Sequence, residues 1–383
     1  MNIYLYLKHF DPYGEKLNDG TSRAVHGLAS GLVNCGAKVT ILCEHQPSTF
    51  AETAYVTKAG YEIRCFANPH GSSPSFKLAK GLQNFVRNSL DSHSLVVLNG
   101  LFHASVYSLS RFLNKYKIPY ILAPHNPYSP AIFNKNPHLK WPYWHIFEKT
   151  LLRKAQAIQV LDSRQSQFIK ELDISVPVFS LPNGFALHEI PKDIAPSNLT
   201  ANSPVKFLFF GRLDAYNKGL DILLTAFANI AQTENIHLTI QGPDQGDKQN
   251  LQTQAAKLNI SHQVSFIDPD FETPPAVIMQ NYQVICIPSR FEGFSLAALE
   301  AMLVERVLLI SDVAGIAPHI EASGCGVVVA PEVSAMTLGI KNLLQRRSQW
   351  TEMGLSGKHY ALEHLQWDKI ASVALQKYQQ LVA

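Results

Sequence analysis

Short apolar runs alternate with amphipathic stretches along almost the whole chain. In the first half, the predicted strands are residues 2–7, 38–43, 61–66, 95–98, 118–123, 156–161 and 176–181. In the second half, they are residues 205–210, 236–241, 263–267, 283–287, 307–310 and 325–329. The predicted helices are residues 21–35, 76–90, 103–114, 143–154, 163–172, 219–232, 248–258, 273–281, 295–304, 334–346 and 366–382. This alternation is typical of α/β proteins with doubly wound parallel sheets.

One stretch interrupts the alternation near the middle of the chain. Pro182-Asn183-Gly184 is followed by residues 190–204, which are rich in Pro, Asn and Ser and have no periodicity. Such a segment is typical of a linker between domains. We therefore predict two Rossmann-like domains, residues 1–185 and 186–365, that face each other across a cleft. Ligands of such sheets bind outside the carboxyl ends of the strands.

Composition adds a difference between the two halves. The chain has 383 residues and a net charge of +3. Residues 1–190 hold 19 Lys and Arg against 12 Asp and Glu. From residue 191 onward, the chain holds 14 Lys and Arg against 18 Asp and Glu. The basic first half and acidic second half suggest different partners. Drift in surface composition is the alternative explanation.

Other features of the composition concern the compartment. No apolar run reaches the length of a membrane span. The start, MNIYLYLKHF, is typical of a first strand rather than of a signal peptide. The five cysteines, at positions 35, 43, 65, 286 and 325, form no CxxC pair. We expect buried thiols in a reducing cytoplasm, rather than disulfides or metal ligands.

Residues 287–304, IPSRFEGFSLAALEAMLV, contain a strand end, a turn with glycine and the start of a helix. This order places free backbone amides and the positive end of a helix dipole together, which favours phosphate binding. Glu292 and Glu300 would be about 12 Å apart on a continuous helix, too far for a hydrolase pair acting on one glycosidic oxygen. An amphipathic helix with two surface glutamates is the alternative. The candidate ligand-binding residues of this stretch are Glu292, Gly293, Phe294, Ser295, Leu296 and Glu300.

A second cluster lies in residues 207–224, FLFFGRLDAYNKGLDILL. The strand ends at Gly211, Arg212 follows on the loop, and Lys218 precedes the next helix. Two fixed cations at the carboxyl edge of a sheet suit a diphosphate; the alternative is two surface cations at loop ends. Asp268-Pro269-Asp270 also follows a strand, where we predict a turn, and we expect no metal.

These two motifs together resemble the donor site of retaining glycosyltransferases of the GT-B fold, family 4. The resemblance is strong over residues 180–383 and weaker over 1–180. It implies that Glu300 holds the ribose of a nucleotide diphosphate sugar and that Glu292 faces the donor sugar. It also implies that Arg212, Lys218 and the amides between the glutamates neutralise the diphosphate, without a cofactor. In this family the terminal helix, here within residues 366–383, crosses back onto the N-terminal domain.

The N-terminal half departs from the family pattern at two positions. Related enzymes have a Gly-Gly pair before the first helix, where this chain has Asp19 and Gly20, so Gly20 is the remaining donor-binding candidate. The family usually has a histidine after the strand 95–98, where this chain has Asn99, which cannot take up a proton. His103 and His125 are further catalytic candidates at the same predicted edge. Each histidine could instead be structural, and His103 could cap the next helix. The first strand is not followed by GxGxxG, which argues against NAD chemistry.

Residues 138–154, HLKWPYWHIFEKTLLRK, interleave aromatic and basic side chains. We favour a helix that packs on its own sheet through its aromatic face. The alternative is a helix at a membrane surface, with rings at headgroup level and cations on anionic lipid.

We therefore predict a glycosyltransferase that moves a sugar from a nucleotide diphosphate sugar to a glycan, lipid or small-molecule acceptor. We expect a cytoplasmic location, with peripheral contact at the inner face of the membrane as the open alternative, and no nucleic-acid partner. Two other functions remain open. One is an epimerase or hydrolase acting on a nucleotide sugar, and the other is a non-catalytic protein that binds sugar nucleotides.

Overall fold

The computed structural model describes residues 1–17, 19–46, 52–70, 75–134, 136–191, 193–194 and 203–382. Parts of the predicted linker 190–204, together with Asn18, therefore lie outside the described residues. The chain divides into two compact units. The N-terminal unit comprises Met1–Ala186 and Gln366–Ala383, and the C-terminal unit comprises Leu187–Leu365.

An eight-stranded sheet forms the centre of the N-terminal unit, in the order β3-β4-β2-β1-β5-β6-β7-β8. Its strands are β1 (Asn2–Tyr6), β2 (Lys38–His45), β3 (Thr53–Val56), β4 (Glu62–Ala67), β5 (Ser94–Asn99), β6 (Tyr120–Ala123), β7 (Ala157–Val160) and β8 (Val178–Ser180). Its helices are α1 (Gly20–Asn34), α2 (Lys80–Ser89), α3 (Ala104–Lys115), α4 (Pro130–Asn134), α5 (Pro137–Tyr143), the π-helix η1 (Trp144–Glu148), α6 (Lys149–Arg153), α7 (Gln165–Glu171) and α15 (Trp367–Val382). All pairings are parallel except that of β3 with β4.

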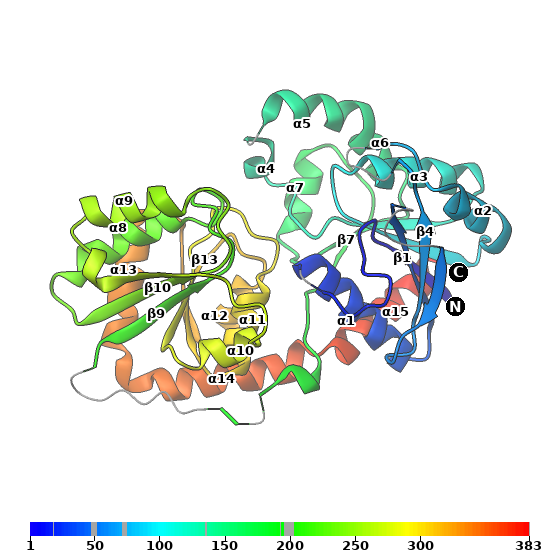
Figure 1. Ribbon diagram of the computed structural model, residues 1–383. Helices are drawn as coiled ribbons and strands as arrows, with labels where there is room; N and C mark the ends of the chain where they lie inside the picture. The colour runs from blue at the N-terminus through cyan, green and yellow to red at the C-terminus, as the bar shows by residue number, and fades with distance from the viewer. Residues whose placement is uncertain are drawn as a thin grey trace. The chain divides into compact units, whose positions relative to one another are not determined.

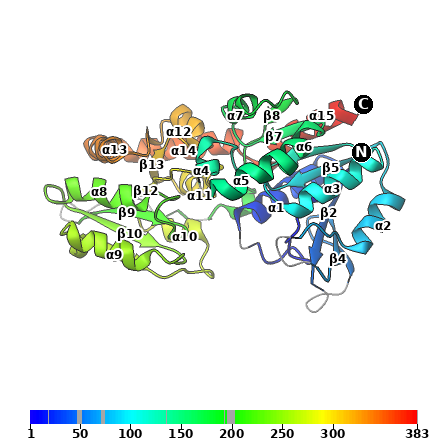
Figure 2. The same ribbon diagram turned by 90° about the horizontal axis from the view of Figure 1, so that it is seen from above.

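The last helix, α15, is packed on the first helix, α1, in this unit (Figures 1 and 2). The Trp367 indole lies directly against the backbone of α1 at Gly27, where a Cβ atom would be 2.0 Å from the indole nitrogen. Asn34 at the end of α1 also donates a hydrogen bond of 2.9 Å to Asp368. Burial of Trp367, Ile370 and Ala371 then joins α15 to the core beneath the sheet.

A six-stranded, wholly parallel sheet forms the centre of the C-terminal unit, in the order β11-β10-β9-β12-β13-β14. Its strands are β9 (Val205–Phe210), β10 (Ile236–Gln241), β11 (Val264–Ile267), β12 (Val284–Ile287), β13 (Val307–Ser311) and β14 (Gly326–Val329). Its α-helices are α8 (Leu220–Ala231), α9 (Lys248–Lys257), α10 (Pro275–Met279), α11 (Leu296–Leu303), α12 (Ala317–Ser323), α13 (Val333–Gln345) and α14 (Trp350–His364). Helices α8, α9 and α13 cover one face, and α10, α11, α12 and α14 cover the other (Figure 1).

The two parallel-sheet α/β units confirm the predicted fold class. The continuous helix predicted over residues 143–154 is wrong in detail. Pro142 lies inside α5, and the chain then passes through the π-helix before α6 begins. This insertion turns Trp144 and Glu148 into the interior, where both are buried.

None of the described helices combines the length and the apolar character needed to cross a lipid bilayer.

Candidate functional site

The carboxyl edge of the C-terminal sheet contains a topological switch point between β9 and β12. These strands are neighbours, and the chain continues from β9 toward β10 on one side and from β12 toward β13 on the other. Loops 211–219 and 288–295 therefore leave the sheet side by side. Ligands of open α/β sheets bind at this position, and both sequence motifs lie in these two loops.

The two loops are in direct contact through their backbones. Gly219 has a φ of 64°, and a Cβ atom there would be 2.0 Å from the Pro288 carbonyl oxygen. The amides of Arg290 and Phe291 donate to the Asn217 carbonyl at 3.0 and 3.3 Å. A glycine is required at position 219 because of both this conformation and this close approach.

The charged side chains of the two loops form a short ion pair. The Lys218 ammonium lies 2.6 Å from the Glu292 carboxylate, and the Ser289 hydroxyl donates to the same oxygen at 3.1 Å. Both partners are mostly shielded, with 20% and 16% of their side chains exposed. Arg212 is exposed and makes no side-chain hydrogen bond or ion pair within the described part of the chain. One oriented and one available cation thus lie at this edge.

Arg290 holds the same loops together from outside. Its guanidinium donates two hydrogen bonds of 2.7 Å to the Asp221 carboxylate in a fork, and it lies over the Tyr216 ring at 4.8 Å. The predicted site did not include this residue, although the Pro-Ser-Arg sequence after β12 was visible. Because Asp221 belongs to the first turn of α8, the pair fixes the loops relative to that helix.

Helix α11 begins at Leu296, with Ser295 as its N-cap in a strained backbone conformation of φ 83°. The Ser295 hydroxyl accepts a hydrogen bond from the amide of Ala298 at 3.3 Å. The amides of Leu296 and Ala297 have no acceptor within the described residues. Phe294 is buried, and its carbonyl accepts a hydrogen bond from Ile316. The helix start therefore offers free amides together with the helix dipole.

Glu300 lies within α11 and is 9% exposed, whereas Glu292 lies outside the helix in the preceding loop. The estimate for a continuous helix therefore does not describe their separation. The roles of both glutamates, and of Gly211 and Gly293 beside them, remain predictions.

The segment Asp268-Pro269-Asp270 has no regular secondary structure and is followed by a bend at residues 271–273. The Asp270 carboxylate accepts the amides of Glu272 and Thr273 at 2.9 Å. Asp268 forms a 2.6 Å ion pair with Lys248.

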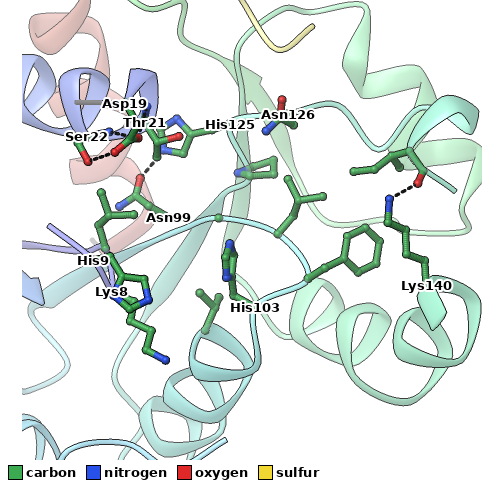
Figure 3. Close-up of a pocket in the computed structure, with 17 residues that line it drawn as sticks. Lys8, His9, Asp19, Thr21, Ser22, Asn99, His103, His125, Asn126 and Lys140 are labelled. Atoms are coloured by element: carbon green, nitrogen blue, oxygen red, sulfur yellow. Dashed lines mark hydrogen bonds between the residues drawn. The ribbon is translucent and has the colours of Figure 1, made fainter. Parts of the chain in front are cut away.

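The N-terminal unit has a pocket of about 430 Å³ at the carboxyl edge of its own sheet (Figure 3). Its walls come from the ends of β1, β5 and β6 and from the start of α1. The volume is within the range of small-molecule sites. The structure brings Asn99, His103 and His125 together in its wall.

Asn99 and His125 form a fixed pair. The Asn99 amide group donates to the carbonyls of Tyr6 and Val97 at 3.1 and 3.3 Å, so its oxygen faces the His125 Nε2 atom at 2.7 Å. Nε2 must then carry the hydrogen, which leaves Nδ1 as the acceptor. Burial lowers the pKa of His125 to about 4. His125 is therefore neutral at pH 7 and suited to accept a hydrogen bond from a hydroxyl group.

His103 is the N-cap residue of α3, in line with the helix-cap interpretation, and its carbonyl accepts the Tyr107 amide at 3.1 Å, although its side chain makes no capping hydrogen bond within the described residues. Its ring lies in the pocket wall. Desolvation and the positive charge of Lys8 lower its pKa.

The start of α1 differs from the arrangement that the resemblance implies. The Asp19 carboxylate accepts the amides of Thr21 and Ser22, each at 2.9 Å, and the Ser22 hydroxyl at 2.6 Å. The chain's own carboxylate therefore fills the position that an anion would take at this helix start. Gly20 is the first residue of α1. Its contact with a donor remains a prediction, and the Asp19 carboxylate at the start of the helix does not favour it.

Two pocket residues, Lys8 and His9, were missed from the sequence. Their position directly after the first strand could have indicated a ligand-binding role, because ligands of such sheets bind outside the carboxyl ends of the strands. Lys8 is only 7% exposed.

A buried carboxyl group lies behind the pocket loop. Glu148 accepts the Phe102 amide at 3.0 Å and the Tyr128 hydroxyl at 2.6 Å through one oxygen. Its other oxygen, Oε2, has no hydrogen-bond partner among the described residues. Burial raises the pKa of Glu148 to about 7, although the hydrogen bonds from Tyr128 and Phe102 act in the opposite direction.

Glu148→Gln is expected to remove part of the pH dependence of stability. The folded pKa is raised from 4.5, so ionisation penalises the folded state as pH rises. Between about pH 4.5 and 7 the free energy of unfolding of the wild type falls by about 3 kcal/mol, and the variant does not show this fall. Urea denaturation of both proteins at pH 5 and pH 8 measures this difference, with the exposed Glu171→Gln as the control. Equal pH dependence in wild type and Glu148→Gln would show that the carboxyl group titrates normally.

A separate group of residues could hold a soft metal ion. Cys43, His45 and Cys65 each place one ligand atom within 4.8 Å of the others, across the β2–β4 pair. Thiolate and imidazole ligands suit Zn²⁺. All five cysteines are free thiols, and Cys35 alone among them is partly exposed.

Comparisons with known proteins agree with this architecture. Residues 18–189 match the model of Glycosyltransferase Family 4, and residues 192–359 match that of Glycosyl transferases group 1. The chain is 28% identical over 173 residues to an uncharacterised glycosyltransferase of Methanocaldococcus jannaschii, covering 45% of this chain and 44% of that protein. It is 27% identical over 170 residues to an MMP α-(1→4)-mannosyltransferase of Mycolicibacterium hassiacum, covering 43% and 41%. These alignments span less than half the length of the curated relatives.

Two solved structures show the same fold over nearly the whole chain. Sucrose-phosphate synthase of Thermosynechococcus elongatus has a TM-score of 0.79 at 19% identity, covering 99% of this chain and 98% of that one. HepE of Anabaena, solved with UDP, has a TM-score of 0.75 at 14% identity, covering 99% and 100%. From the two family matches and this shared fold, we conclude that the chain belongs to glycosyltransferase family 4 and has the GT-B fold.

Proposed function

We propose that the protein is a retaining glycosyltransferase that moves a sugar from a nucleotide diphosphate sugar to a glycan, lipid or small-molecule acceptor. The observation that carries this proposal is the joined pair of loops at the β9–β12 switch point. They place Lys218, Arg212 and the free amides of α11 at one edge. This arrangement suits a ligand with two phosphates.

In the proposed reaction, the bond between the donor sugar and the diphosphate breaks and negative charge grows on the leaving phosphate. Lys218, Arg212 and the α11 amides stabilise that charge, which is the main source of catalysis. Glu292 orients Lys218 and fixes the donor sugar through its hydroxyls, and Glu300 holds the ribose. The acceptor hydroxyl oxygen forms the new bond to the anomeric carbon on the face from which the diphosphate leaves, and the departing phosphate oxygen takes the acceptor proton.

The N-terminal pocket supports a transferase over an epimerase. A general base works best with a pKa near the working pH, and the pKa of His125 is about 4. His125 is therefore poorly suited to abstract a proton at neutral pH. Its fixed Nδ1 acceptor and Asn99 suit the binding of hydroxyl groups, and we assign this pocket to the acceptor.

Release of nucleoside diphosphate tests the proposal. The protein is incubated with UDP-, GDP- and ADP-sugars, each with and without a panel of sugar acceptors. UDP-glucose comes first because HepE was solved with UDP and glucose. A transferase releases the diphosphate only when an acceptor is present, and NMR of the product shows whether the anomeric configuration is kept. Equal release without acceptor would favour a hydrolase, and binding without release would favour a non-catalytic protein.

We also propose peripheral membrane contact near the pocket. Leu139, Trp141 and Ile146, on α5 and the π-helix, are 62%, 41% and 60% exposed. Exposed apolar side chains of this kind can enter the headgroup region. Packing on the unit's own core, the favoured sequence interpretation, accounts for Trp144 and for one face of Trp141, which stacks on the buried Phe133 at 4.4 Å. It does not account for Leu139 and Ile146.

The double variant Leu139→Asp/Ile146→Asp is expected to lose binding to anionic vesicles, measured by co-sedimentation. Absence of vesicle binding in the wild type would refute membrane contact and leave the transferase proposal intact.

A further inference from the structure

Lys8 carries a positive charge that the described structure leaves without a counter-ion. It lies two residues after β1, lines the N-terminal pocket and is 7% exposed. Its ammonium makes no hydrogen bond or ion pair within the described part of the chain. Buried charges are normally paired, because removing an ion from water costs several kcal/mol. An unpaired ammonium in a pocket wall therefore indicates that an external anion completes the site.

Two imidazole rings lie within the electrostatic reach of Lys8. Desolvation by burial and, after it, the positive charge of Lys8 lower the pKa of both His9 and His103. In Figure 3 the side chains of Lys8, His9 and His103 lie below the pair formed by Asn99 and His125. An ammonium and two imidazole rings therefore line the same pocket.

No carboxylate of the pocket wall is available to neutralise Lys8. Asp19 is the one acidic residue among the described residues of the wall. Its oxygens accept the Thr21 and Ser22 amides and the Ser22 hydroxyl. The second lysine of the wall, Lys140, donates to the Ile132 carbonyl. The cationic part of the pocket thus faces an open volume with no competing internal anion.

We propose that the acceptor carries a phosphate group, which binds to Lys8 with His9 and His103 as further donors. This inference deepens the proposed transferase function and rests on the assignment of the pocket to the acceptor. A phosphate has three oxygens for these donors, and charge-assisted hydrogen bonds to it are about twice as strong as neutral ones. The part of the pocket that holds Asn99 and the Nδ1 atom of His125 then contacts hydroxyl groups.

The binding test uses the full chain with UDP, GDP or ADP, whichever binds, at physiological ionic strength. Isothermal titration compares glucose 6-phosphate with glucose, and co-sedimentation compares phosphatidylcholine vesicles with and without phosphatidylinositol. We expect glucose 6-phosphate to bind at least about 10-fold more tightly than glucose, or the vesicles with phosphatidylinositol to bind at least about 10-fold more tightly than the net-neutral vesicles of phosphatidylcholine alone. Binding of glucose 6-phosphate would indicate a soluble sugar phosphate, and binding of the phosphatidylinositol vesicles alone would indicate a lipid phosphate.

Two substitutions locate the effect. Lys8→Gln is expected to weaken binding of the phosphate probe about 10- to 100-fold, whereas Lys170→Gln, an exposed lysine of the same unit, should leave it unchanged. Lys8→Met should raise the melting temperature without ligand, because it removes an unpaired buried charge.

Equal binding by Lys8→Gln and wild type, or no phosphate binding by a wild type that still binds a nucleotide, would overturn the inference. A lower melting temperature of Lys8→Met would also overturn it, since the ammonium would then be structural. Failure of every nucleotide to bind would instead count against the proposed function itself.

Discussion

Lys218→Ala is expected to lower sugar transfer, measured as kcat/KM, by about 100- to 1,000-fold. The Lys218 ammonium lies 2.6 Å from Glu292 at the switch point, and both side chains are mostly shielded from water. A cation held there in advance stabilises a leaving diphosphate without reorganisation. The variant removes that charge and also leaves the Glu292 carboxylate without its partner. The unpaired carboxylate then repels the diphosphate.

The matched control is Lys248→Ala. Lys248 also forms a 2.6 Å ion pair in the C-terminal unit, but its partner Asp268 is 87% exposed and belongs to the loop after β11. We expect less than about a twofold change in activity, because exposed ion pairs contribute little. Similar losses in the two variants would show that the Lys218–Glu292 pair has no special role.

Gly219→Ala is expected to destabilise the C-terminal unit and to abolish transfer. An alanine at a φ of 64° costs about 1–2 kcal/mol. Its Cβ would also meet the Pro288 carbonyl at 2.0 Å, and relieving this overlap costs about 1–3 kcal/mol more. The loop 288–295, which carries Glu292 and the start of α11, must then move away from Lys218. Thermal unfolding and kcat/KM measure the two effects.

Gly324→Ala separates the conformational cost from the steric one. Gly324 ends α12 with a φ of 65°, nearly the value at Gly219, but a Cβ atom there would meet nothing within 4 Å. This variant should lose about 1–2 kcal/mol and keep its activity. If Gly219→Ala lost no more stability than Gly324→Ala and remained active, close contact between the two loops would not be needed.

The central parallel strands could be predicted from the sequence because they are buried on both faces. The boundaries predicted for β9 and β10 agree with the structure, since runs such as VKFLFF are apolar at every position but one. The antiparallel edge strand β3 was missed because only alternate residues of its four-residue run are partly buried. Helix α14 was missed because its buried residues, which include two glycines, give a weak apolar stripe.

The location of candidate residues could be predicted better than their partners. Arg212, Lys218 and Glu292 follow strand ends, and parallel topology brings such loops to one edge. The Lys218–Glu292 pair joins residues 74 positions apart, and no local pattern indicates it. The same is true of the Asn99–His125 hydrogen bond. The burial of Lys8 depends on tertiary packing around the end of β1, which composition does not reveal.

Nucleotide binding tests the central claim, that the β9–β12 loops form a diphosphate site, most directly. The melting temperature of the wild type, Lys218→Ala and Glu300→Ala is measured with UDP, GDP and ADP. A ligand at 100 times its dissociation constant stabilises the folded state by about 2.7 kcal/mol. We predict that one nucleotide raises the melting temperature of the wild type and that both substitutions remove this shift. No shift with any nucleotide, with or without magnesium, or an equal shift in all three proteins, would contradict the account.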